Sequence, residues 1–117
     1  EIVIATGARP YVPPLPGLDE GTYYTSDTIW SLRALPRRLL VLGGGPIGCE
    51  LAQAFARLGA SVTIVEQGPR LLAREDEDVA APVATRFAAE RILVYANCKA
   101  LRVEAVDDGR RLVAQYG

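Results

Sequence analysis

The chain has no histidine and no methionine among its 117 residues, and it has only two cysteines, Cys49 and Cys98. The absence of histidine removes the commonest general acid and base from this segment. The two cysteines match neither the spacing of a zinc site nor a Cys-x-x-Cys redox motif, so we expect both to be buried free thiols. Because methionine is absent and the first residues have the pattern of the middle of a strand, we expect a piece of a longer protein.

Long hydrophobic runs and an excess of one charge are also absent. No run approaches the ~20 apolar residues that cross a bilayer, and no signal-peptide pattern opens the chain, so we expect no membrane span and a cytoplasmic location. The net charge is -1, and the basic residues lie in scattered pairs, which gives no electrostatic reason to expect nucleic acid as a partner. Half of the residues are hydrophobic and 23% are charged, as is typical of a globular domain.

From residue 37 onward, strand and helix patterns alternate. Short apolar or β-branched runs predict strands, and apolar residues repeating at helical spacing predict helices. The first helix begins with Pro46, where the missing N–H does no harm. An acidic run opens the second helix, with Val79, Val83 and Phe87 on one face. The predicted strands cover residues 37–42, 61–66 and 92–95, and the predicted helices cover 46–58 and the residues from 75 onward. This βαβαβ order predicts an α/β, Rossmann-like fold with a parallel sheet and right-handed crossovers.

Three flanking segments complete the predicted organisation. Residues 1–7 form a short apolar run stopped by a glycine, and we expect a strand there. Residues 10–18 hold four prolines and a glycine, which favour an extended connector. Ser26 is a good N-cap for a helix that would end at Pro36. Residues 101–116 alternate around an Asp-Gly pair, which predicts a β-hairpin.

Four glycines lie within six positions where the first of these strands meets the first helix. Glycine inside regular structure costs about 0.5–1 kcal/mol relative to alanine, so such a cluster needs either a flexible loop or a specific use. Gly43, Gly45 and Gly48 fit the Gly-x-Gly-x-x-Gly pattern of dinucleotide-binding folds. In that pattern the glycines permit a tight turn, a close approach of the backbone to a pyrophosphate, and close packing of the helix on the strand. The pyrophosphate lies at the positive end of the helix.

An acidic residue follows at the spacing that such folds use. Glu66 ends the next strand, 18 residues beyond Gly48, and a carboxylate about 20 residues after the motif binds the ribose hydroxyls of the adenosine. The alternative is a flexible glycine loop with Glu66 as an ordinary solvated strand end. The preceding strand, the following helix and the acid together favour a dinucleotide site.

The same carboxylate predicts that the cofactor is NAD(H) in preference to NADP(H). A 2′-phosphate beside Glu66 would place like charges ~4 Å apart, which costs about 4 kcal/mol at an effective dielectric constant of 20. The counter-argument is Arg70, four residues further on, which could turn back to neutralise a phosphate.

Beyond these features, the sequence resembles the flavoprotein pyridine nucleotide-disulfide oxidoreductases, which include dihydrolipoamide dehydrogenase, glutathione reductase and mercuric reductase. The stretch "IVIATGARP" is similar to the strand and turn with which that family leaves its FAD domain, and "PPLPG" is similar to its connector. The Thr-Ser-Asp, Leu-Pro, Gly-Gly-Gly-x-Ile-Gly-x-Glu and Arg-Leu-Leu signatures occur in the family's order and spacing. The resemblance implies that residues 1–18 end an FAD domain and connector. Residues 19–117 would form an NAD(P)-binding Rossmann domain that lacks its last strands, with the hairpin as part of a β-meander.

The resemblance also implies roles for individual residues. The three motif glycines, with Pro46 and the amide of Ile47, would hold the NAD(P) pyrophosphate, and Glu66 would bind the adenine ribose. Ala100 lies where the family often runs its backbone past the adenine. Glu50 matches a family glutamate that lies near the nicotinamide and pairs with a lysine of the FAD domain.

Some positions are open to another interpretation or depart from the family. Glu50 shares a polar stripe with Gln53 and Arg57, where an acid near a helix N-terminus stabilises by a few tenths of a kcal/mol, roughly, without any further role. Pro46 stands where glutathione reductase-like members carry a tyrosine that gates the nicotinamide pocket. Arg91 stands where relatives have a glycine, and a left-handed conformation there would cost roughly 1 kcal/mol.

The family's Cys-x4-Cys redox pair, its FAD pyrophosphate motif and its catalytic histidine have no match in this chain. The resemblance therefore implies the NAD(H)-binding part of an FAD-dependent oxidoreductase, which delivers hydride from reduced nicotinamide to FAD and on to a disulfide or similar acceptor. Alone, the chain would be inactive. Its partners would be the dinucleotide, the FAD and interface domains of the parent chain, and a second copy in a homodimer. The alternative is a free-standing dinucleotide-binding module without catalysis, although such a module has no need of a strand and turn from another domain.

Overall fold

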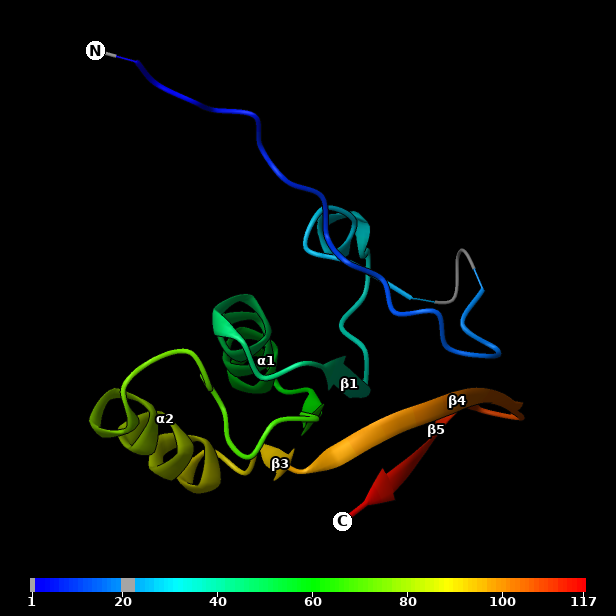
Figure 1. Ribbon diagram of the computed structural model, residues 1–117. Helices are drawn as coiled ribbons and strands as arrows, with labels where there is room; N and C mark the ends of the chain where they lie inside the picture. Colours follow the sequence, from blue (N-terminus) through cyan, green and yellow to red (C-terminus); the bar gives the residue numbers. More distant parts are fainter. Residues whose placement is uncertain (1, 20–22) are drawn as a thin grey trace.

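The computed structural model describes residues 2–19 and 23–117 as an α/β structure with a connector at its N-terminal side (Figure 1). A parallel sheet has the strand order β1-β2-β3, and a second sheet is the antiparallel pair β4-β5. The elements are η1 (Ile29–Ser31), β1 (Arg38–Leu42), α1 (Pro46–Leu58), β2 (Ser61–Val65), α2 (Glu77–Ala89), β3 (Leu93–Tyr95), β4 (Cys98–Val106) and β5 (Gly109–Tyr116). The predicted βαβαβ order and closing hairpin are confirmed, and no helix in the described ranges is long and apolar enough to cross a membrane.

Both helices cover the same face of the parallel sheet, and the hairpin lies on the other side (Figure 1). Alternate residues of a strand point to opposite faces, so Val62 and Ile64 of β2 both face the helices and are almost fully buried. Ala52 of α1 and Phe87 of α2 pack in the same cluster. The helix over 46–58 begins and ends as predicted, with Pro46 in its first turn and Gly59 as its C-cap.

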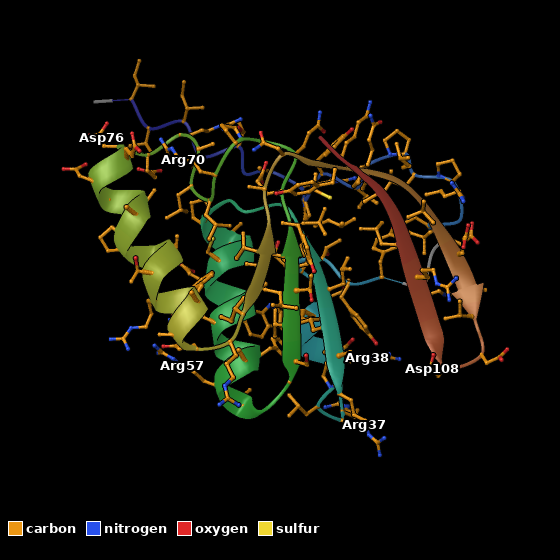
Figure 2. The ribbon with its side chains drawn as sticks, turned by 90° about the horizontal axis from the view of Figure 1, so that it is seen from below. Arg37, Arg38, Arg57, Arg70, Asp76 and Asp108 are labelled. Carbon is orange, nitrogen blue, oxygen red and sulfur yellow. The ribbon has the colours of Figure 1, made fainter. Side chains whose placement is uncertain are left out.

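The hairpin turn lies one residue earlier than the Asp-Gly pattern predicts. Val106 pairs with Gly109, so Asp107 and Asp108 form the turn and the glycine is the first residue of β5, with φ of 146°. An exposed ion pair joins this turn to the start of β1, from Arg38 Nη2 to Asp108 Oδ2 at 2.5 Å (Figure 2).

Two predicted elements are wrong. Residues Ile2–Gly7 form no strand, and Ile2, Val3 and Ile4 are more than four-fifths exposed. A strand needs a partner for its amides and carbonyls, and nothing in residues 2–19 or 23–117 pairs with this segment. Glu1, which the prediction included, lies outside the described residues.

The helix predicted to begin at Ser26 is a single 3₁₀ turn, Ile29–Ser31, which follows Thr28. The indole Nε1 of Trp30 donates to the Ser26 carbonyl at 2.7 Å, so a side chain takes the position of a helical amide. The amide of Thr25 donates to the Thr28 hydroxyl at 2.9 Å. Local bonds of this kind compete with a helical backbone.

Helix α2 begins at Glu77, and its buried face differs from the prediction at one position, near the start of the helix. Ala80 and Phe87 are buried and Val83 is half-buried, whereas Val79 is 55% exposed. Pro82 lies inside the helix, where it removes one backbone hydrogen bond.

Arg91, which follows α2, has the left-handed φ of 61° that the sequence comparison with the family raised as a possibility. We expect Arg91→Gly to raise the free energy of unfolding by about 1 kcal/mol, because glycine adopts this conformation without a Cβ penalty. Urea unfolding measures the difference. Arg91→Ala is the matched control, since it keeps the Cβ and should give no comparable gain; equal gains in both variants would contradict the explanation by φ.

Glu90 joins the ends of the two helices. Its carboxylate accepts hydrogen bonds from Arg57 Nη2 at 2.8 Å, Arg57 Nε at 3.1 Å and Gln53 Nε2 at 3.1 Å. The hydrogen bond from Arg57 is the largest cause of a lowered pKa at Glu90, and it also raises the pKa of Arg57.

Because the pKa of Glu90 is lowered in the folded state, its charged form stabilises the fold above the ordinary glutamate pKa of about 4.3. That stabilisation is lost as the pH falls through the lowered pKa. We expect Glu90→Gln to reduce the free energy of unfolding at pH 7 and to flatten its decline between about pH 5 and pH 3. Equilibrium unfolding across this pH range measures both effects, and a decline as steep in the variant as in the parent would contradict the assignment.

Candidate functional site

The turn between β1 and α1 lies at the carboxyl edge of the parallel sheet. The amide of Gly43 donates to the Val65 carbonyl at 2.8 Å and so continues the pairing of β1 with β2. Gly43 then turns the chain with a φ of 101°, which side chains other than glycine rarely adopt. The next residue, Gly44, is buried, whereas Gly45 and Pro46 are exposed at the start of the helix.

Two glycines of the motif differ in the space around them: Gly48 is packed closely against the turn, and Gly45 is open to solvent. A Cβ on Gly48 would overlap the carbonyl oxygen of Gly43 and would come within 3.4 Å of Val41 Cγ1. A Cβ on Gly45 would meet no atom within 4 Å. The inner glycine therefore allows close helix–strand packing, and the outer one leaves free space beside the backbone.

No side chain in the described part of the protein caps the N-terminus of α1. Among residues 2–19 and 23–117 no side-chain hydrogen bond caps this helix, no acid lies in its first turn, and Pro46 occupies the first helical position. In the described ranges the amides of Gly45, Ile47 and Gly48 have no hydrogen-bond partner. These N–H groups lie at the positive end of the helix dipole, an arrangement that favours an anion.

Glu66 follows β2 and lies against the glycine turn. Its Oε2 accepts a hydrogen bond from the Gly44 amide at 2.5 Å, and its Oε1 accepts one from the Gly68 amide at 2.5 Å. The backbone of Glu66 is fixed as well, because its amide donates to the Tyr95 carbonyl and its carbonyl accepts from the Cys98 amide, both at 2.9 Å. The carboxylate is half-buried and held in one orientation.

Glu50 and Ala100 stand apart from this group. The side chain of Glu50 is exposed on α1, one turn beyond the glycine turn. Ala100 lies in β4, opposite Ala114 and next to a β-bulge, two residues beyond the Cys98 amide that reaches Glu66. The structure thus brings Glu66 together with the glycines, Pro46 and Ile47, and connects Ala100 to them only through the start of β4.

The sequence did not single out the residues that support the turn from the loop between β2 and α2. The Leu72 amide donates to the Gly44 carbonyl at 2.8 Å, and Leu71 is buried against Gly44. Gly68 supplies the second amide to Glu66. The sequence feature that could have pointed to this support is the Arg-Leu-Leu stretch, which the sequence analysis named as a family signature without assigning it a role.

Two hollows border the site. A small polar one of about 200 Å³ is lined by Gln67, the residue that follows Glu66, and by Asn97, Lys99, Gln115 and Gly117. A broad one of about 1180 Å³ reaches from the glycine turn and the first turn of α1 to the connector and the hairpin.

Cys49 is buried in the first turns of α1, and its Sγ donates to the Gly44 carbonyl at 3.4 Å. Burial raises the pKa of this thiol, and the charges of Glu66 and then Glu50 raise it further. Cys98 is also buried, and both cysteines are free, as predicted. A protonated, enclosed thiol of this kind contributes packing to the turn.

Comparison with known proteins identifies the family of this chain. The family model described as "Pyridine nucleotide-disulphide oxidoreductase" matches residues 1–116. The chain is 43% identical over 115 residues to a mercuric reductase of Acidithiobacillus ferrooxidans, covering 98% of this chain and 21% of the relative. It is 38% identical over 109 residues to a soluble pyridine nucleotide transhydrogenase of Pseudomonas savastanoi, covering 93% of this chain and 24% of the relative.

Among solved structures, the HOCl-induced flavoprotein disulfide reductase RclA from Escherichia coli superposes with a TM-score of 0.86 at 34% identity. The match covers 97% of this chain and 26% of RclA. The chain therefore spans about a quarter or less of the length of these relatives. The match of the family model over almost the whole chain, together with these identities, shows that the chain belongs to the pyridine nucleotide-disulphide oxidoreductase family.

Proposed function

We propose that this chain is the NAD(H)-binding part of an FAD-dependent oxidoreductase. The observation that carries the proposal is the uncapped N-terminus of α1, with open space at Gly45 and the fixed carboxylate of Glu66 beside it. An anionic group fits the N-terminus of α1, and hydroxyl donors fit the carboxylate of Glu66. A dinucleotide carries both.

In this proposal the amides of Gly45, Ile47 and Gly48 hold the pyrophosphate, and Glu66 accepts hydrogen bonds from the adenine ribose. The small polar hollow that Gln67 and Lys99 line would lie at the adenosine end, near the start of β4 where Ala100 lies. Glu50, further along α1, lies toward the nicotinamide end.

The chain's own residues bind and orient the dinucleotide. A bound reduced nicotinamide would supply one kind of chemistry, the donation of hydride to a flavin. Residues 1–18 would end the flavin-binding domain and connector, and residues 19–117 would form the dinucleotide-binding domain. The complete protein would be a homodimer that passes electrons to a disulfide or a similar acceptor.

Two features support a preference for NAD(H). Glu66 presents a negative charge where a 2′-phosphate would carry another. Arg70, the cation that could offset this charge, donates hydrogen bonds to the carbonyls of Leu71, Leu72 and Glu75 at 3.2, 2.7 and 2.6 Å. Its guanidinium is thus engaged within its own loop.

We expect the full-length enzyme to show a higher kcat/KM for NADH than for NADPH, and we expect Glu66→Ala to lower that ratio by about tenfold or more, because the charge repulsion is removed. Steady-state kinetics with both nucleotides measure the ratio. Lys99→Ala is the companion variant, since Lys99 is the cation that lines the small polar hollow. A better rate with NADPH, or a ratio unaffected by Glu66→Ala, would contradict the assignment.

A pair of glycine variants tests the phosphate site itself. Gly45→Ala adds a methyl group in open space, so we expect little change in the free energy of unfolding but a rise of about tenfold in the Kd for NADH. Gly48→Ala forces overlap with the Gly43 carbonyl, and we expect it to lower both stability and affinity. Calorimetric titration and urea unfolding measure the two quantities. Ala54→Ser, exposed on α1, is the control; unchanged affinity in Gly45→Ala would remove the main support for the site.

We expect the isolated chain to consume no NADH above the buffer rate when FAD and a disulfide are added, because it has no histidine and both of its thiols are enclosed.

The raised pKa keeps the Cys49 thiol protonated at pH 8, and we expect slow alkylation by iodoacetamide in the folded chain. Turnover that disappears in Cys49→Ser would overturn both expectations.

A further inference from the structure

We propose that Arg70 is a positioning residue for the phosphate-binding turn, which it holds through Leu72 and Gly44 without touching the dinucleotide. This inference rests on the proposed function, because it assigns a role within the same site. Arg70 belongs to the loop between β2 and α2, and Figure 2 shows it close to Asp76 at the start of α2.

The guanidinium of Arg70 organises this loop from within. Its Nη1 donates to the carbonyls of Leu72 at 2.7 Å and Leu71 at 3.2 Å, and its Nη2 donates to the carbonyl of Glu75 at 2.6 Å. Arginine suits such a task because its rigid planar fork presents several donors at once, whereas lysine presents a single point charge.

Leu72 has the backbone conformation that reverses the direction of this loop. Its φ of 50° lies in the left-handed region, which is unfavourable for a leucine and persists only where the surroundings determine it. Its carbonyl accepts hydrogen bonds from Arg70 and from the Glu75 amide at 2.9 Å, and its amide donates to the Gly44 carbonyl at 2.8 Å. The left-handed conformation therefore connects Arg70 to the glycine turn.

Gly44 is held from three sides. Leu72 donates to its carbonyl, Glu66 accepts from its amide, and the side chain of Leu71 lies 2.6 Å from the position that a Cβ on Gly44 would occupy. Fixing the peptide groups of Gly44 fixes the direction in which the chain enters α1. The next amides, beginning with Gly45, are those proposed to bind the pyrophosphate, so their orientation depends on this support.

The competing role for Arg70 is direct contact with a 2′-phosphate, and the two roles predict different kinetics. A contact to the 2′-phosphate affects NADPH alone. A positioning role affects the pyrophosphate site that NADH and NADPH share, so both nucleotides lose affinity by the same factor.

The test uses Arg70→Ala and Arg70→Lys in the full-length protein with its flavin bound. We expect both variants to raise the KM for NADH and for NADPH by a common factor of about tenfold or more, with kcat within about twofold and the flavin absorbance spectrum unchanged. Arg74→Ala is the matched control, because Arg74 is an exposed arginine in the same loop; we expect its KM values to remain at those of the parent. A loss confined to NADPH, or no change in either KM, overturns the proposal.

Leu72→Gly in the Arg70→Ala background gives a second, independent readout. Glycine adopts the left-handed conformation without support, so we expect the double variant to recover several-fold of the lost NADH affinity. A further loss in the double variant contradicts the route through Leu72. If Arg70→Ala does not fold, Arg70→Lys and its own Leu72→Gly partner are judged by the same criteria. A raised KM in Gly45→Ala without one in the Arg70 variants refutes this inference alone, whereas unchanged KM values in all of them refute the proposed function.

Discussion

The arrangement of the site depends on one carboxylate, that of Glu66, which accepts a hydrogen bond from the Gly44 amide and another from the Gly68 amide. Each bond joins the end of β2 to a neighbouring loop, the first to the glycine turn after β1 and the second to the loop that leads to α2. Hydrogen bonds from amides to an ionised carboxylate are stronger than those between neutral groups, and they offset the cost of half-burying a charge. Two loops that are distant in sequence thereby share one anchor.

The hydrogen bonds to Glu66 hold the glycine turn rigid at Gly44 and leave it open at Gly45. Gly44 is enclosed by Glu66, Leu71 and Leu72, while Gly45 faces free space. Rigidity matters here because amides that are already oriented lose little freedom when a ligand binds. Openness matters because a residue without a side chain lets an anion approach the backbone closely. The order of the glycines, buried first and exposed second, separates the two requirements.

Local sequence was sufficient where the determining residues are adjacent in the chain. Pro46 and Gly59 mark the ends of α1, and the helix was predicted to the residue for that reason. Sequence failed where a partner decides the outcome: residues 2–7 have the composition of a strand but no partner, and the indole of Trp30 diverts a carbonyl that a helix would use. The support of Gly44 by Leu72 was missed because it joins residues far apart in the sequence through backbone atoms, which carry no sequence signal. The spacing from Gly48 to Glu66 predicted the position of the carboxylate but not its bond to Gly44.

The charges of the site constrain the ligand more closely than its shape does. The α1 N-terminus favours a negative group, and the Glu66 carboxylate disfavours one while accepting hydroxyl donors. These opposite preferences are built on loops that are hydrogen-bonded to each other, so their separation is fixed by the fold. A ligand with phosphate at both positions would satisfy the helix and be repelled by the carboxylate, and one with hydroxyls at both would leave the helix amides without an anion. The combination of an internal phosphate and an uncharged ribose would satisfy both, so the proposed preference for NAD(H) rests on the same carboxylate that hydrogen-bonds to the turn.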